Sequence, residues 1–224
     1  MRGLMPGLAL AALAGAAPAT VAPPQASLRA WDFAVTLDGK PIGWHRFRLV
    51  PGAAAGTRML HSEAQYRVSF LGIPVFRYDH EAREQWQGDC LSALSASTDD
   101  DGRKSGVQAD LGADGLRITR STPGAEQPPP PQVASGCIMS FAYWNPAMRE
   151  QSRLLNPQTG LIEAVQIAQL AGGSLTAGGQ VVAAERWRIS GAASPIDVWY
   201  TADGDWVGLD AQVGGTRKLS YRLQ

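Results

Sequence analysis

Apolar and polar residues alternate along many short segments of the chain, and this period of two is typical of half-buried β-strands. Trp31, Phe33, Val35 and Leu37 share one face of the first such segment. Glycine adopts a positive φ without strain and aspartate tolerates it, so an Asp-Gly pair between such segments predicts a tight hairpin turn. Asp-Gly pairs occur at positions 38–39, 101–102, 114–115 and 203–204.

A longer hairpin is predicted from segment 58–71, a turn at Gly72-Ile73-Pro74 and segment 75–87. Along its second strand, apolar and aromatic side chains alternate with charged ones. That pattern indicates an antiparallel sheet with one face in water, because the strands of a buried parallel sheet are apolar on both faces. Further strands are predicted over residues 90–97, 106–111, 116–121, 161–170, 180–190, 197–201, 206–212 and 217–223.

One helix is predicted, with Asn145 as its N-cap, Pro146 in its first position and good helix formers from Ala147 to Leu155. A helical turn over 138–143 is a second candidate, and the proline-rich stretch 123–132 is expected to be an extended surface loop. About ten strands and one helix predict a mainly β fold. We expect a large curved antiparallel sheet, or an open, incompletely closed β-barrel, with one short covering helix.

Residues 1–26 are predicted to be a signal peptide and a flexible N-terminal segment. Arg2 precedes an apolar run from Gly3 to Ala17, and small residues follow, as at a secretory cleavage site. A retained membrane anchor is the alternative, but Pro18 ends the run before it reaches the length of a bilayer span. The sequence therefore predicts an exported, periplasmic protein in which residues 27–224 form a single β-rich domain without a transmembrane anchor after cleavage.

Charge and cysteine content refine this picture. Lys plus Arg and Asp plus Glu both number 20, and there is no basic run, so nucleic acid is not an expected partner. The two cysteines are Cys90 and Cys137. Outside the cytosol an even number of cysteines favours a disulfide over two free thiols.

Three segments carry a resemblance to known proteins: Phe141–Pro146, Leu154–Gly160, and Ile196–Thr201 with the Asp-Gly hairpin that follows it. They resemble a bacterial family of exported proteins of unknown function. The last segment also resembles a second uncharacterised periplasmic family. Both families are distantly similar to open β-barrels of the lipoprotein-localisation-factor type, in which a curved sheet holds an acyl chain. The resemblance implies a fold and supplies no catalytic residues.

The three histidines are the first candidates for catalysis. His45 and His80 fall on the apolar faces of their strands, whereas His61 falls on a polar face. Two imidazoles in one concavity would serve as proton donor and acceptor near pH 7, with Glu84 orienting His80. The alternative is that each histidine makes only local hydrogen bonds. No motif with the spacing of a metal or nucleotide site is present, so no metal or cofactor is expected.

Aromatic residues on alternate strand positions either fill a core or line a cavity. Asn145 is either a helix cap or a polar group at the mouth of such a cavity. The leading hypothesis is a binding or carrier protein for a lipid or other apolar molecule, possibly acyl-bearing, held on the concave face of the sheet. The alternatives are an enzyme that acts on a lipid-like substrate by histidine acid–base chemistry, and a structural envelope protein without a ligand. The candidate ligand-binding residues are Tyr66, Tyr78, Tyr143, Trp144, Asn145 and Trp199.

Overall fold

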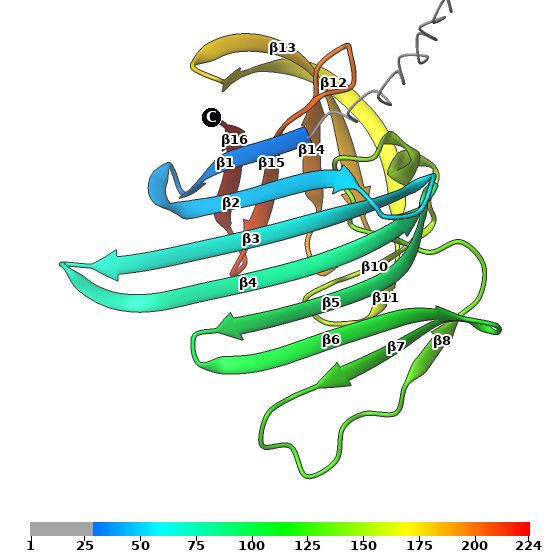
Figure 1. Ribbon diagram of the computed structural model, residues 1–224. Coiled ribbons are helices and arrows are strands. Elements are labelled where there is room, and N and C mark those ends of the chain that lie inside the picture. The colour runs from blue at the N-terminus through cyan, green and yellow to red at the C-terminus, as the bar shows by residue number, and fades with distance from the viewer. Residues whose placement is uncertain (1–28) are drawn as a thin grey trace, which may run out of the picture.

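A computed structural model describes residues 29–224, and most of this range is β-strand (Figure 1). The predicted signal peptide, residues 1–26, lies outside the described residues. The predicted mainly β fold and large curved antiparallel sheet are confirmed. The covering element differs from the predicted helix.

The strands form a large sheet and a small one. Thirteen antiparallel strands make the large sheet, in the order β12-β13-β14-β15-β16-β1-β2-β3-β4-β5-β6-β7-β8, and β9, β10 and β11 make the small one. Because β12 and β8 are the two ends of the large sheet, it does not close into a barrel. The bounds are β1 Arg29–Leu37, β2 Lys40–Pro51, β3 Thr57–Phe70, β4 Ile73–Gln87, β5 Cys90–Asp100, β6 Arg103–Gly112, β7 Gly115–Ser121, β8 Gln132–Ala134, β9 Met139–Ser140, β10 Arg153–Leu155, β11 Ile162–Ala164, β12 Gln166–Ala177, β13 Gln180–Ser190, β14 Ile196–Tyr200, β15 Trp206–Val213 and β16 Arg217–Leu223.

The inner, concave face of the large sheet carries the core. Phe33, Phe47 and Trp206 meet there, with ring centroids 4.3 Å apart for Phe33–Trp206 and 5.0 Å for Phe47–Trp206. Trp206 is 1% exposed and Phe33 is equally buried. Aromatic rings at these separations stabilise a core beyond the area that they bury.

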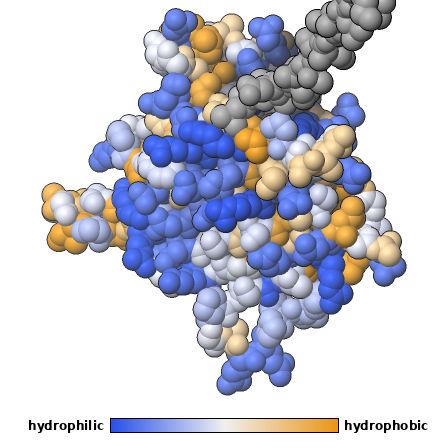
Figure 2. Space-filling view, in the orientation of Figure 1, coloured by the Kyte–Doolittle hydropathy of each residue, from blue (hydrophilic) through white to orange (hydrophobic). Residues whose placement is uncertain are grey.

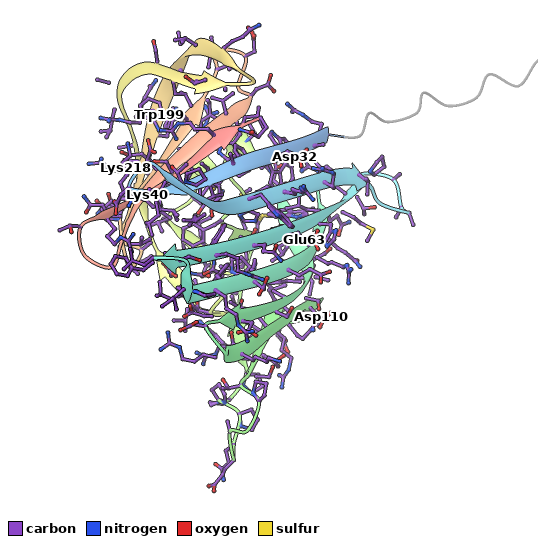
Figure 3. All side chains as sticks on the ribbon, turned by 90° about the vertical axis from the view of Figure 1, so that its left-hand side faces the viewer. Asp32, Lys40, Glu63, Asp110, Trp199 and Lys218 are labelled. Atoms are coloured by element: carbon purple, nitrogen blue, oxygen red, sulfur yellow. A yellow bond between two sulfur atoms is a disulfide. The ribbon has the colours of Figure 1, made fainter. Side chains whose placement is uncertain are left out.

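The outer, convex face is charged, and Figure 2 shows its hydrophilic surface over β2 to β4. Asp32 on β1, Glu63 on β3 and Asp110 on β6 all lie on this side of the sheet (Figure 3). Cross-strand ion pairs such as Arg48–Asp32, at 2.8 and 2.9 Å, connect neighbouring strands. The alternation in the sequence thus separates an apolar inner face from a charged outer one.

Two of the Asp-Gly pairs adopt positive φ at both residues, as the hairpin prediction requires: Asp38 has φ 51° and Gly39 φ 77°, and Asp101 has φ 54° and Gly102 φ 90°. The β3–β4 turn differs from the prediction. It is made by Leu71 and Gly72 instead of Gly72-Ile73-Pro74, because Ile73 already pairs with Phe70.

The predicted helix is confirmed at its start, with Asn145 as N-cap and Pro146 in the first position, but its predicted extent to Leu155 is wrong. A 3₁₀ helix, η1, spans only Pro146–Glu150, and Leu154 and Leu155 lie in β10, where both are fully buried. Gln151 and Ser152, which would follow Met148 on one face of an α-helix, are polar, so a longer helix would bury no continuous apolar stripe. The helical-turn candidate at 138–143 is also wrong, because it contains β9, which pairs in parallel with β10.

Two further expectations change in detail. The strand predicted over 161–170 is two strands, β11 and β12, separated by the buried Val165. β12 continues past Leu170 through Gly172 and Gly173, where a β-bulge interrupts its pairing with β13. A side chain at 172 would collide with the carbonyl oxygen of Ala184, so glycine here permits the close approach of two strands. The proline-rich stretch is an exposed loop between β7 and β8, as predicted.

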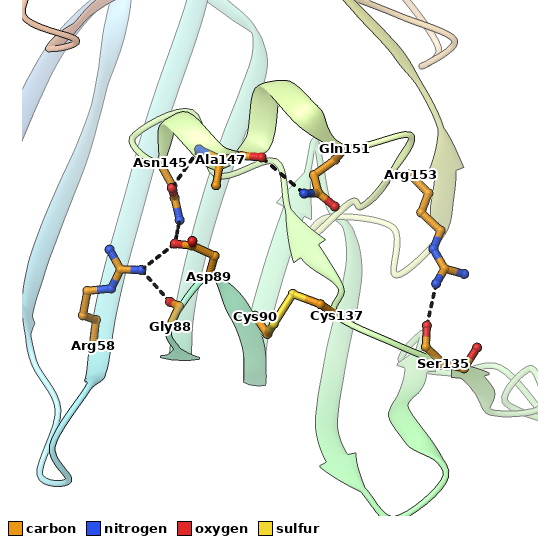
Figure 4. Close-up of a disulfide and its surroundings, with 10 residues drawn as sticks. All are labelled: Arg58, Gly88, Asp89, Cys90, Ser135, Cys137, Asn145, Ala147, Gln151 and Arg153. Atoms are coloured by element: carbon orange, nitrogen blue, oxygen red, sulfur yellow. Dashed lines mark hydrogen bonds and ion pairs between the residues drawn. A yellow bond between two sulfur atoms is a disulfide. The ribbon is translucent and has the colours of Figure 1, made fainter.

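The predicted disulfide between Cys90 and Cys137 is confirmed (Figure 4). It joins the first residue of β5 to the segment that leads into β9 and η1. Asn145 caps η1: its side-chain oxygen accepts a hydrogen bond from the Ala147 amide at 3.1 Å, and its amide donates to Asp89 at 3.0 Å. The segment that covers the inner face is therefore attached to the β4–β5 turn.

Removal of this disulfide should destabilise the domain. The bond closes a loop with a sequence separation of 47, for which the chain-entropy model gives about 4 kcal/mol. We expect a C90S/C137S double variant to lose close to this amount of unfolding free energy, measured by denaturant titration of the purified protein. A loss below about 1 kcal/mol would mean that the covering segment is held by its buried side chains alone.

Candidate functional site

Two adjoining cavities hollow the inner face of the large sheet. The first has a volume of about 440 Å³, and the second, nearer the β3–β4 turn, about 550 Å³. Both are lined by Gln158, Val213 and Gly214, so they meet along the sheet. We refer to the two together as the inner groove. Its aromatic and polar lining includes His45, Ser62, His80, Glu84, Tyr143 and Trp144 in the first cavity, and Tyr66, Tyr78 and Tyr221 in the second.

His45 lies where the two cavities meet. Its Nε2 is 2.9 Å from the hydroxyl of Ser62 on the neighbouring strand. Its Nδ1 faces two hydroxyls, that of Tyr221 at 3.4 Å and that of Tyr66 at 3.5 Å. Tyr66 and Tyr221 also share a hydrogen bond with each other. One imidazole and three hydroxyls thus form a connected network in the groove.

His80 lies on β4, directly across β3 from His45, and is 5% exposed. Its Nδ1 is 2.9 Å from the hydroxyl of Thr98 on β5. The structure therefore places His45 and His80 in one cavity, as the alternation of the sequence indicated. His61 lies on the outer face, 3.1 Å from Glu81.

The buried environment keeps these groups uncharged at neutral pH. Desolvation lowers the pKa of His80 to about 4. It also lowers the pKa of His45 well below its ordinary value, and the proximity of His80 lowers it further. Burial raises the pKa of Tyr66 and Tyr78 far above neutrality. Neutral imidazoles can accept a proton or share hydrogen bonds, but at pH 7 they are not the proton donors of an acid–base pair.

Glu84 does not orient His80, which the sequence had suggested. Its carboxylate accepts a hydrogen bond from Trp86 Nε1 at 3.0 Å, and Ser140 provides a second hydrogen bond. Burial nevertheless raises the pKa of Glu84 to about 7 against the effect of both hydrogen bonds. The spacing along β4 correctly places Glu84 and His80 on the same face. Each side chain, however, bonds to a nearer partner, Glu84 to Trp86 and His80 to Thr98.

The other sequence candidates divide into two groups. Tyr143 and Trp144 line the first cavity, and Tyr66 and Tyr78 line the second. Asn145 and Trp199 are not in the groove. Asn145 uses both ends of its amide to cap η1 and bind Asp89, as described above. Trp199 donates a hydrogen bond to Asp210 at 3.0 Å and lines a separate polar hollow beside Arg186 and Lys218.

Sequence reasoning missed two polar groups of the groove, Ser62 and Tyr221, and it also missed Thr98, which bonds His80 from the neighbouring strand. Ser62 and Thr98 share the alternation of their apolar neighbours, which would have placed them on the inner face. Tyr221 reaches His45 only because the C-terminal strand β16 pairs with β1, across a sequence separation of 176. No local pattern reveals that pairing.

Comparison with known proteins adds a family. Residues 33–224 match the model of a domain of unknown function (DUF6134). The chain belongs to this family. The DUF6134 match runs from Phe33 in β1 to the C-terminus and so includes every residue that lines the groove. A search of curated proteins finds no match.

Between residues 29 and 224, His, Cys, Asp and Glu side chains do not gather in any group of three or more that could hold a metal ion. Over the same range, no helix has the length and apolar character needed to cross a bilayer.

The titration of Glu84 predicts a pH dependence of stability. Its folded-state pKa of about 7 is above the value of 4.5 for a free glutamate, so the folded state binds the proton more tightly. Stability is therefore lost as pH rises from about 4.5 to 7, by roughly 3 kcal/mol in total. We expect Glu84→Gln, measured by denaturant titration from pH 5 to 8, to be more stable than the wild type by an amount that grows with pH. A difference that is constant with pH would contradict this assignment.

Proposed function

We propose that the chain is an exported binding or carrier protein that holds an apolar, possibly acyl-bearing molecule in the inner groove. The observation that carries the proposal is the pair of adjoining cavities on an open sheet. Small-molecule sites are typically concave, mostly apolar and supplied with a few polar groups, and the groove has these properties. Its volume, about 440 Å³ and 550 Å³ for the two parts, is in the range of such sites.

The disulfide and the N-terminal residues support export to the periplasm. Cys90–Cys137 is stable in an oxidising compartment, whereas cytosolic thiols are kept reduced. The apolar run from Gly3 to Ala17 has the composition of a signal peptide. A carrier in the periplasm would move its ligand through water between membranes.

The polar lining favours an uncharged ligand. Neither arginine nor lysine is among the described residues that line the first cavity. Arg217, at the second, is engaged by Asp38 at 2.9 Å. A carboxylate or phosphate buried here would lack a cationic partner, which is costly. The hydroxyl of Tyr78 is buried without a hydrogen-bond partner among the described residues, and it can donate to an acceptor such as a carbonyl oxygen.

The second candidate is an enzyme that acts on a lipid-like ester. It is favoured by the 2.9 Å contact between His45 Nε2 and the Ser62 hydroxyl, which has the reach of a nucleophile and its base. The other imidazole nitrogen faces tyrosine hydroxyls instead of a carboxylate. Ester hydrolysis that Ser62→Ala abolishes would establish this candidate. If no apolar molecule binds, the structural envelope role would be the function to pursue.

A bulkier side chain in the groove should block binding. Ala82 is 2% exposed and lies between His80 and Glu84 in the first cavity. We expect Ala82→Phe to occupy part of that cavity and to lower the affinity for N-phenylnaphthylamine, an uncharged fluorescent probe, at least tenfold. Gln85→Phe, on the outer face of the same strand, is the matched control and should bind as the wild type does. Equal binding by both variants would place the ligand elsewhere.

Tyr78 should distinguish ligands by their oxygen atoms. In competition with the same probe, methyl laurate should bind more tightly than laurate, whose carboxylate would be buried without a cation. Tyr78→Phe should weaken methyl laurate by about 1 kcal/mol, or roughly fivefold, and leave dodecane unaffected. Tyr200→Phe removes a buried hydroxyl outside the groove and is the control. Tighter binding of laurate than of methyl laurate would contradict the proposal that the ligand is uncharged. If none of the three molecules binds, the proposed carrier function is wrong.

A further inference from the structure

The β3–β4 hairpin ends in an exposed apolar tip, which we define as residues 68–76. Every residue in it is uncharged. Large side chains that would normally be buried are open to solvent here: Leu71 is 86% exposed, Phe70 67%, Ile73 66% and Val75 53%. Figure 2 shows the apolar end of this hairpin projecting at the left of the molecule. Exposed apolar patches on a folded protein mark sites of interaction.

The tip extends beyond the sheet. β2 pairs with β3 as far as Tyr66, and β5 pairs with β4 as far as Tyr78. Past these two residues, β3 and β4 pair only with each other, as a two-stranded ribbon that Figure 1 shows reaching past its neighbours. The tip therefore has no core of its own to bury its apolar side chains.

Leu71 is a strained choice for its position. It has φ 50° and precedes Gly72 with φ 80°. The matching positions in the β1–β2 and β5–β6 turns are occupied by Asp38 and Asp101, residues that tolerate positive φ. A leucine there is unfavourable for the backbone, and its exposed side chain adds little buried apolar area to stabilise the fold. Contact with something outside the domain would account for a leucine at this position.

We propose that the hairpin tip inserts into the surface of a lipid bilayer. Three or four residues separate its base from its turn, a reach of about 10 Å at the rise of a β-strand. Apolar faces of interfacial segments are buried about 5–10 Å deep, so the dimensions agree. A narrow, convex ribbon enters lipid without any requirement for a complementary shape, which a protein partner would have to supply.

The charges at the base of the tip fit the same partner. Arg67 and Arg77 are cross-strand neighbours there, at the level that lipid headgroups would occupy. Each also contacts a carboxylate, Arg67 with Asp79 at 2.7 Å and Arg77 with Asp99 at 3.2 Å. Because the arginines are already paired, apolar insertion supplies most of the binding, and anionic lipid adds to it without being required.

The tip also borders the inner groove. Val68, Val75 and Phe76 line the second cavity, so the groove opens beside the residues that would enter the membrane. An apolar ligand would pass between bilayer and groove at this point. Membrane docking itself rests on the exposure and strain of the tip, and it does not require that the groove hold a ligand.

Vesicle flotation of the mature protein tests the proposal. We expect the wild type to bind phosphatidylcholine vesicles, and to bind more tightly when phosphatidylglycerol is added. Leu71→Asp should reduce binding at least tenfold, since it removes one of the most exposed apolar side chains and adds a charge. The same substitution should raise the Tm by roughly a few degrees, because aspartate suits the positive φ. This opposite movement of stability and binding distinguishes docking from a structural role.

Val181→Asp is the matched control, because Val181 is 76% exposed in the β12–β13 hairpin, away from the tip. It should leave vesicle binding unchanged. Absence of wild-type binding to both kinds of vesicle would overturn the proposal, as would unchanged binding by Leu71→Asp. Concentration-dependent dimerisation that Leu71→Asp abolishes, in a protein that ignores vesicles, would make the tip a self-association surface instead. The proposed carrier function is tested separately, by probe binding in the absence of lipid.

Discussion

The apolar inner face of the large sheet must be covered, and the rest of the structure depends on how the chain does this. Within residues 29–224, the other sheet has only three strands, so the large sheet curves and packs its own inner face together. At one end Trp206 packs against Phe33 and Phe47, and the segment of η1 and β9 to β11 adds Met148, Leu154 and Leu155 to the same core. The groove lies between the inner face and this covering segment, which supplies Tyr143, Trp144 and Gln158 to its lining, and it continues toward the β3–β4 turn.

Alternation along single strands keeps two very different environments a few ångströms apart. On β4, His80 is buried and uncharged, while Asp79 forms an ion pair with Arg67 on the outer face. On the inner side of the sheet, both histidines are held in neutral pairs, His80 with Thr98 and His45 with Ser62. Such pairs avoid the large desolvation cost of a buried charge while leaving hydrogen-bonding groups within reach of a ligand.

The fold could largely be predicted from the sequence because its main determinants are local. Turn residues and a period of two located most strands, including β16 at 217–223 with its bounds unchanged. A covering helix was predicted, but its extent was wrong because the buried residues of this segment have no helical or strand period; Leu154 and Leu155 are adjacent and both fully buried. The site was predicted only in part. Alternation shows which face a residue occupies, as for His45 and His80, but not which neighbour it bonds, as for Glu84.

The disulfide has a mechanical consequence. It fixes the covering segment to the start of β5, and the hydrogen bond from the Asn145 amide to Asp89 holds the same end to the β4–β5 turn. This end of the molecule is therefore cross-linked to the sheet by a covalent bond and a hydrogen bond. At the opposite end, β3 and β4 run on past their neighbours as a two-stranded ribbon. A ribbon of two strands has fewer lateral hydrogen bonds than a strand paired on both sides, so a deformation of the sheet costs least at the hairpin end.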